Sequence, residues 1–202
     1  MSTARERILA RLRTQSGNAP AHLASPIANG VMEDDPIARF MARANALQST
    51  AERLASLDTV PLAVAAYLQS HKLPRQLVCW PQYDPLDWAG ASIVRAPVAD
   101  SHTLVGLTGC FAAIAETGTL MLCSSATTPA ITSLLPETHI AVVMASQIVR
   151  TMEEGFQRLQ TTLGRPPRAV NFVSGPSRTG DIEQTMTLGA HGPYRVHLLL
   201  VG

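Results

Sequence analysis

The sequence predicts an α/β fold with a mainly parallel sheet, helices on both faces of that sheet and one inserted β-hairpin. Apolar residues at helical spacing alternate along the chain with short apolar runs of strand length. The run Ile140–Met144 contains no polar residue, which is typical of a strand covered on both faces. Two further apolar runs, 111–115 and 120–123, flank a short polar segment with a glycine, and this pattern predicts the hairpin.

Residues 1–35 are predicted to form an N-terminal helix and a flexible arm, with one domain at 36–202. Thr3 and Glu6 have the spacing of a capping box, and Ile8 and Leu9 then share one helical face. Four arginines make this helix basic, so it is either a solvated arm or a segment that docks on a membrane surface or a partner. The Gly, Pro, Asn and Ala residues of 15–35 predict a mobile connection.

The elements of the domain follow in order. Asp35 and Pro36 predict an N-cap and the first turn of a helix with an apolar face. Residues 50–55 fit either an extension of that helix or a short strand. Besides the hairpin and the strand at 140–144, the predicted elements are helices at 62–68 and 151–163 and strands at 76–80, 92–94, 169–173 and 196–201.

Composition excludes several classes of function. The 202 residues are 46% apolar and 15% charged, which predicts a globular chain. A net charge of +1 and an aromatic content of 4% give no reason to expect a nucleic-acid partner. No apolar run is long enough to span a bilayer, and the N-terminus lacks the apolar core of a secretory signal, so we expect a cytoplasmic protein.

The sequence predicts no metal or cofactor bound by this chain. The three cysteines form no CxxC pair and the six histidines no HExxH motif. Gly106–Gly109 is rich in glycine, but a strand-like run follows it where a dinucleotide fingerprint needs a helix. We expect buried, reduced thiols, with Cys110 as the one to test for reactivity.

The hydroxyl-rich stretch 124–129 has two interpretations. Either Thr128 caps a short helix opened by Pro129, or the hydroxyls bind an anion.

The polar segment of the hairpin, Glu116-Thr117-Gly118-Thr119, supplies the first candidate site. Glu116 either points into water from the hairpin tip or serves as an acid, base or ligand-holding group in a cleft. In a cleft, the hydroxyls of Thr117 and Thr119 would satisfy the carboxylate by hydrogen bonding.

The loop after the strand at 169–173 supplies the second candidate site. Ser174, Gly175, Ser177 and Arg178 could present amides, hydroxyls and a cation to a small carboxylate or phosphate ligand. Asp181 lies where an acidic residue favours a helix start, and this needs no ligand. His191 is either an acid–base group or a histidine packed in a turn.

Four segments together resemble the LUD-domain family, and more narrowly its LutC/YkgG branch, lactate utilization protein C. They are AIAETGTLML at 113–122, LLPETHIAVV at 134–143, SGPSRTGDIE at 174–183 and GAHGPYRVHLLLV at 189–201. The resemblance implies a NagB/RpiA/CoA-transferase-like fold and a role in oxidation of L-lactate to pyruvate. It also implies two partner proteins that carry iron–sulfur clusters, with this chain as the component that binds no cofactor.

Carried over residue by residue, the resemblance supports 116–119, 174–177, Asp181 and His191 as site positions. The sequence departs from the family pattern at Gly180, where the family more often has alanine. Three functions stay open: a component of a lactate-oxidising system, a stand-alone enzyme, or a non-catalytic sensor or scaffold for a small anion. The stand-alone enzyme would act on a sugar phosphate or CoA thioester with Glu116 as base or nucleophile.

Overall fold

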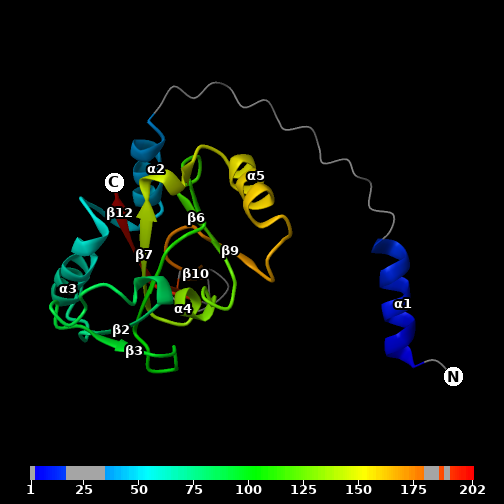
Figure 1. Cartoon of the computed structure of the whole chain (residues 1–202), viewed down its shortest axis with the longest axis horizontal. Coiled ribbons are helices and arrows are strands. Elements are labelled where there is room, and N and C mark those ends of the chain that lie inside the picture. Colours follow the sequence, from blue (N-terminus) through cyan, green and yellow to red (C-terminus); the bar gives the residue numbers. More distant parts are fainter. Residues whose placement is uncertain (1–2, 17–34, 180–186, 189–191) are drawn as a thin grey trace. The chain divides into compact units, whose positions relative to one another are not determined.

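The structure, a computed structural model, describes residues 3–16, 35–179, 187–188 and 192–202 (Figure 1). The chain divides into two units, Met1–Glu33 and Asp34–Gly202. Most of the predicted mobile connection lies outside the described residues, and so do Gly180, Asp181 and His191.

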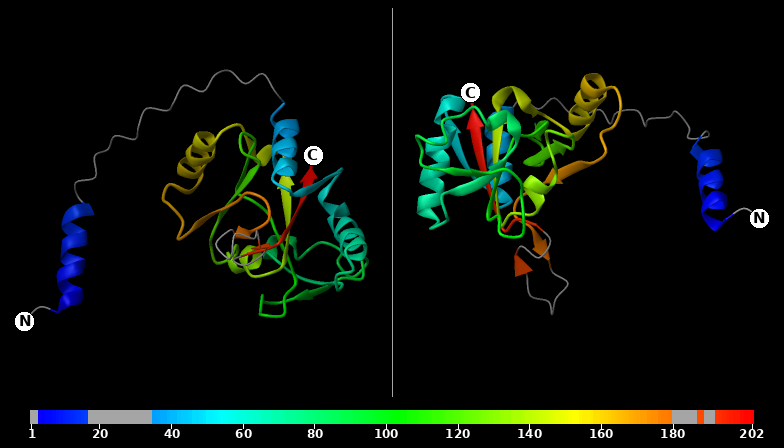
Figure 2. Two further views of the ribbon diagram at one scale, coloured as in Figure 1. Left: turned by 180° about the vertical axis from the view of Figure 1, so that it is seen from behind. Right: turned by 60° about the horizontal axis from the view of Figure 1, so that its bottom comes forward.

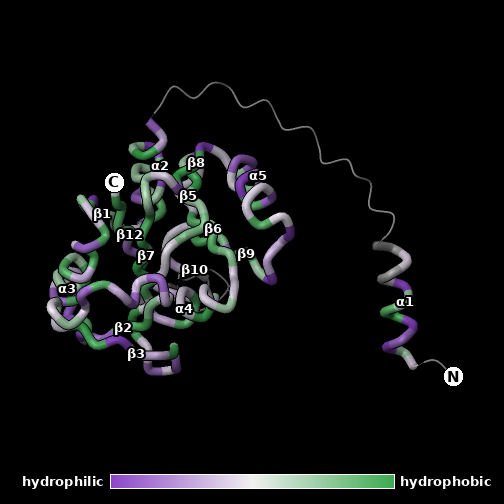
Figure 3. The backbone as a smooth tube through the Cα atoms, viewed as in Figure 1, coloured by the Kyte–Doolittle hydropathy of each residue, from purple (hydrophilic) through white to green (hydrophobic). Residues whose placement is uncertain are grey.

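The N-terminal unit contains one described helix, α1 (Ala4–Ser16). The predicted capping box is confirmed, because the backbone N–H of Thr3 donates to the Glu6 carboxylate at 2.8 Å and the backbone N–H of Glu6 donates to the Thr3 hydroxyl at 3.3 Å. Ile8 and Leu9 are exposed, and polar and apolar residues are mixed along the helix (Figure 3).

The second unit is built on a six-stranded sheet in which every pairing is parallel, so the predicted α/β class with a mainly parallel sheet is confirmed. The strands, in spatial order, are β1 (Thr50–Leu54), β12 (Arg195–Val201), β7 (Thr138–Met144), β4 (Val105–Thr108), β2 (Gln76–Cys79) and β3 (Val94–Ala96). The central strands β7 and β12 are apolar and almost wholly buried, as the uninterrupted apolar runs predict (Figure 3).

Helices lie on both faces of this sheet. On one face, the ring of Tyr67 from α3 (Val60–Ser70) stacks on His197 of β12, with ring centres 4.2 Å apart. On the other face lies α4 (Ile131–Leu134), so close to β4 that a Cβ on Gly106 would meet the carbonyl oxygen of Thr132 at 2.0 Å. Gly106 therefore has to be glycine.

The predicted hairpin is present, but it belongs to a second sheet and is not inserted in the parallel one. It pairs β5 (Ala112–Ile114) with β6 (Thr119–Cys123) in antiparallel fashion, and β8 (Ile148–Val149) and β9 (Val170–Val173) flank it in the order β8-β5-β6-β9. Leu120 and Leu122 of β6 join the main core, whereas Met121 packs with Leu159 of α5 (Met152–Leu163). In Figures 1 and 2, α5 and α3 lie on opposite sides of the domain.

The helix predicted after Asp35 is α2 (Pro36–Ala46), and its N-cap is confirmed because the Asp35 carboxylate accepts from the backbone N–H of Ile37 at 2.9 Å. Phe40 and Ala44 bury its apolar face in the core. The remaining elements are three 3-10 turns, η1 (Leu57–Thr59), η2 (Pro81–Tyr83) and η3 (Ala145–Gln147), and the pair β10 (Arg178–Thr179) and β11 (Thr187–Leu188).

Three local predictions need correction. The glycine-rich stretch 106–109 is largely strand β4, because Gly106 serves the close approach of α4 and not a turn. Thr128 does not cap α4: Ala130 is the N-cap, and the Thr128 hydroxyl donates instead to the carbonyl of Cys123 at 2.7 Å. The strand predicted at 92–94 is β3, two residues later, and the ambiguous stretch at 50–55 contains strand β1.

In the part of the chain that the structure describes, no helix has the length and apolar character needed to cross a bilayer.

Candidate functional site

The first candidate segment, 116–119, is the turn that joins β5 to β6. Its backbone is held at Glu116, whose N–H donates to the carbonyl of Arg150 at 2.9 Å, and at Gly118, whose N–H donates to the carbonyl of Ile114 at 2.8 Å. Gly118 has a φ of +70°, and a Cβ there would meet the backbone nitrogen of Ala44 at 2.5 Å. The turn is therefore fixed against the C-terminal end of α2.

The second candidate segment, 174–177, is the bend that follows β9. Gly175 has a φ of +80°, and a Cβ there would meet the carbonyl oxygen of Leu47, the C-cap of α2, at 2.2 Å. The Arg178 guanidinium donates to the same carbonyl at 3.5 Å, and the backbone N–H of Ser177 donates to the carbonyl of Pro193 at 2.7 Å. This bend therefore packs on the same end of α2 as the turn does.

The two segments meet directly, because the hydroxyl oxygens of Thr119 and Ser174 lie 2.7 Å apart. The contact follows from the antiparallel pairing of β6 with β9, which sets Leu120 opposite Val173. We call residues 116–119 and 174–178 the hydroxyl junction. Sequence reasoning nominated both segments, and the structure brings them together at the end of α2.

The hydroxyl junction is open to solvent. The side chains of Glu116, Thr117, Ser174 and Arg178 are exposed, whereas Thr119 is buried. Within the described part of the chain, Glu116 has no hydrogen-bonding side-chain partner, so it occupies an exposed hairpin tip and not a cleft.

The junction has the donors that a small carboxylate needs. When the Thr119 hydroxyl donates to Ser174, the O–H of Ser174 is left free to donate to a ligand. Arg178 adds a positive charge and further N–H donors, which suit a carboxylate. The negative charge of Glu116 opposes an anion placed close to it, which favours the side of the junction formed by Ser174 and Arg178.

Asp181 and His191, the other nominated residues, lie outside the described residues. The described residues contain no group of three or more His, Cys, Asp or Glu side chains arranged to hold a metal ion.

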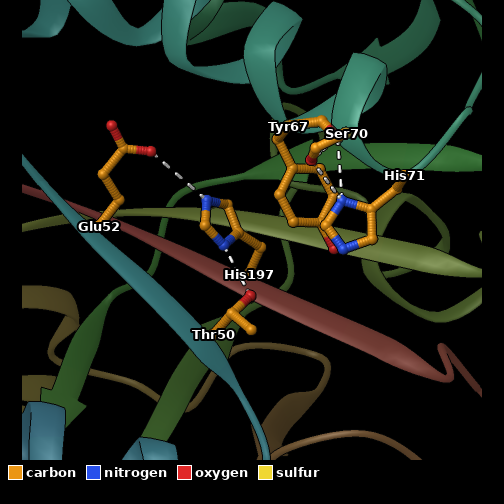
Figure 4. A network of polar contacts seen from close by, with 6 residues as sticks. All are labelled: Thr50, Glu52, Tyr67, Ser70, His71 and His197. Carbon is orange, nitrogen blue, oxygen red and sulfur yellow. Dashed lines mark hydrogen bonds and ion pairs between the residues drawn. The ribbon is translucent and has the colours of Figure 1, made fainter.

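A polar network on the α3 face, with buried His197 and Tyr67 at its centre, could not be found from the sequence (Figure 4). The Nδ1 atom of His197 lies 2.8 Å from the Thr50 hydroxyl, and its Nε2 atom lies 4.0 Å from the Glu52 carboxylate. His197 stacks on Tyr67, which in turn stacks on His71 with ring centres 4.1 Å apart. Burial first, and then the charge of nearby His71, lower the pKa of His197 to about 4. The half-exposed Glu52 acts in the opposite direction, but solvent screens it.

A second buried histidine, His139, lies on the opposite face of the sheet. The Thr108 hydroxyl donates to the carbonyl of Gly109 at 2.8 Å, so the 2.7 Å contact with His139 is a donation from its Nε2–H. Burial lowers the pKa of His139 to about 4, and the ring is therefore neutral. The sequence signal for both histidines is their position inside apolar strands, where a neutral, packed side chain is expected.

Comparison with known proteins identifies the family. The LUD domain matches residues 99–201, a region that contains the whole hydroxyl junction. The Lactate utilization protein C of Shouchella clausii is 38% identical over 112 residues, which are 54% of this chain and 47% of that protein. The protein of the same name from Deinococcus radiodurans is 37% identical over 126 residues, 58% of this chain and 59% of that protein.

The fold is also found in a crystal structure, that of a DUF162 family protein from Deinococcus radiodurans. It superimposes with a TM-score of 0.62 at 26% identity and covers 86% of this chain and 100% of that one. The chain spans about half the length of the curated relatives that it matches. Since the LUD domain covers about half of the chain, in the region that holds the central strands and both candidate segments, the chain belongs to the LUD domain family.

Proposed function

We propose that the chain acts in lactate utilisation, as a component that binds a small carboxylate at the hydroxyl junction. In this proposal separate iron–sulfur proteins accept the electrons when L-lactate is oxidised to pyruvate. The observation that carries the proposal is the similarity to several proteins named Lactate utilization protein C, at 36–41% identity for the first four of them.

The chemistry of the junction supports this assignment of the ligand. L-Lactate carries a carboxylate and a neighbouring hydroxyl. Ser174 and Arg178 would donate to the carboxylate, and Ser177, in the same bend, would bond the hydroxyl. Gly118 and Gly175 keep the two segments tight against α2, so the donors are held in position before the ligand arrives.

One observation favours a second function, a stand-alone enzyme with the NagB/RpiA/CoA-transferase-like fold. Glu116 is an exposed carboxylate on a backbone fixed by the bond to Arg150, which suits a base or nucleophile. Such an enzyme would act on a sugar phosphate or CoA thioester without partners.

A reconstitution separates the two functions. The purified chain is assayed for L-lactate-dependent reduction of an artificial electron acceptor, alone and with separately purified iron–sulfur proteins as the proposed partners. The proposal predicts activity only in the mixture, and a loss of about tenfold for Arg178→Gln, while the exposed control Arg165→Gln keeps full activity. Turnover of a phosphosugar or acyl-CoA by the chain alone, abolished by Glu116→Gln, would establish the second function instead.

A further inference from the structure

A recess of about 250 Å³ opens beyond the carboxyl ends of β2 and β4, away from the residues of the hydroxyl junction. Four of its lining residues matter here: Trp80 and Gln82 follow β2, Phe111 follows β4, and Ser124 follows β6. Ser124 begins the hydroxyl-rich stretch 124–129, whereas the other three belong to no segment nominated from the sequence.

The chain topology singles out this position. After β2 the chain moves outward to β3, at the edge of the parallel sheet, whereas after β4 the next strand of that sheet is β7, on the inner side. The ends of β2 and β4 therefore form a topological switch point, where the connections diverge and leave a crevice. Ligands of open α/β sheets bind in such crevices.

Hydrogen bonds hold the walls of the recess in place. The backbone N–H of Trp80 donates to the carbonyl of Leu107 at 3.1 Å, and its indole N–H donates to the carbonyl of Pro129 at 3.2 Å. Gln147 fixes the end of β4, because its amide donates to the carbonyl of Cys110 at 2.7 Å. A recess built in this way is formed before a ligand binds.

The lining indicates an uncharged ligand with an apolar ring. No charged side chain is among the described residues that line the recess, and Trp80, Phe111 and Leu163 give it aromatic and apolar walls. Aromatic walls favour a flat ring, which packs in offset or edge-to-face geometry. The Arg158 guanidinium lies 5.9 Å from the centre of the Phe111 ring, so a cationic ligand would lose its hydration here and would also be repelled.

Two polar groups can orient such a ring. The Ser124 hydroxyl accepts from the backbone N–H of Ala169 at 2.9 Å, so its own O–H is free to donate. The amide of Gln82 uses one N–H on the Tyr83 hydroxyl and has a second N–H left to donate. By contrast, the Thr128 hydroxyl is already used, since it donates to the carbonyl of Cys123. Spare donors in an apolar recess match a carbonyl oxygen on the ligand.

We propose that this recess binds a small, uncharged ring compound that carries carbonyl oxygens, held between the aromatic walls and oriented by Gln82 and Ser124. This inference does not depend on the proposed function, because it uses neither Ser174 nor Arg178. Binding is non-covalent: Cys110 is buried with its pKa raised to about 12, so it stays a neutral thiol.

The test uses duroquinone, an uncharged ring with two carbonyl groups whose full substitution prevents addition of thiols. Binding to the whole chain is followed by NMR through the indole N–H of Trp80. The indole N–H of Trp88, bonded to the carbonyl of Tyr83 at 2.8 Å, serves as the internal reference. We expect a saturable shift of the Trp80 signal and binding of benzylammonium, a positively charged ring compound of similar size, at least about tenfold weaker.

Two variants locate the binding. Gln82→Leu removes an orienting donor and should weaken binding by about fivefold, and Leu163→Trp fills the recess and should abolish it. Gln157→Leu, an exposed change on α5 outside the recess, should leave binding unchanged. The inference is overturned if duroquinone gives no saturable shift, if benzylammonium binds equally well, or if Leu163→Trp binds like the wild type.

Discussion

The hydroxyl oxygens of Thr119 and Ser174 lie 2.7 Å apart, although the two residues are 55 positions apart in the sequence. Thr119 is buried and Ser174 is exposed, so the bond joins the core to the surface of the hydroxyl junction. Without Ser174 the buried hydroxyl would lose its partner.

The energy of this contact can be measured with a double-mutant cycle. Ser174→Ala should lower the free energy of unfolding by about 1 kcal/mol, because it leaves the buried Thr119 hydroxyl unpaired. In a Thr119→Val background the same change should cost much less, which gives a coupling energy of about 1 kcal/mol. Urea denaturation of the four proteins gives the value. A coupling of zero would show that the two hydroxyls do not interact in solution.

The two glycines of the junction should tolerate no side chain. Gly118→Ala and Gly175→Ala combine a positive φ with a clash against the backbone of α2, and each should destabilise the protein by about 3 kcal/mol or more. Gly164 is the matched control, because it has a φ of +65° but nothing within 4 Å of the added Cβ. Gly164→Ala should therefore cost only the backbone strain, about 1 kcal/mol. Equal losses at all three positions would argue against the packing on α2.

Stability should fall in mild acid because of His139 and His197. Burial lowers the pKa of each from 6.5 to about 4, so the unfolded chain takes up these protons first as the pH falls. The free energy of unfolding therefore keeps its full value above pH 6.5. It decreases by about 3 kcal/mol per histidine as the pH falls toward 4.

Chemical denaturation at several pH values checks this prediction. His197→Gln should remove about half of the pH-dependent loss, because one of the two titrating groups is gone. His102→Gln, at an exposed position, should keep the full pH dependence. A pH profile unchanged by His197→Gln would contradict the burial of a neutral His197.

The cysteines should react slowly with alkylating agents, and Cys110 most slowly of all. Burial raises the pKa of Cys110 to about 12 and, with the charge of Asp84, the pKa of Cys79 to about 11. Cys123 is half-buried, and burial raises its pKa as well. Mass spectrometry after iodoacetamide treatment gives the order in which the three cysteines are alkylated. In denaturant, all three cysteines should react at similar rates. Fast modification of Cys110 in the folded protein would mean that its site opens.

The α/β class and most elements could be predicted from the sequence, because apolar periodicity is local. The second sheet could not, since the pairing of β6 with β9 depends on tertiary packing and not on either run alone. Strand β4 was missed because Gly106, which the approach of α4 requires, interrupts its apolar pattern. Both segments of the site could be nominated from their polar residues. Their contact with each other at the end of α2 could not be predicted. The recess at the ends of β2 and β4 depends on strand order, which local patterns do not contain.

In the proposed function, the turn at 116–119 and the bend at 174–177 form one binding site for a small carboxylate. Titration of the isotope-labelled chain with L-lactate, followed by NMR through the backbone amides of both segments, tests it most directly. Signals from Thr119 and Ser174 should shift together and give one dissociation constant, which Arg178→Gln should raise. Saturating L-lactate that moves neither segment, or only one of them, would contradict it.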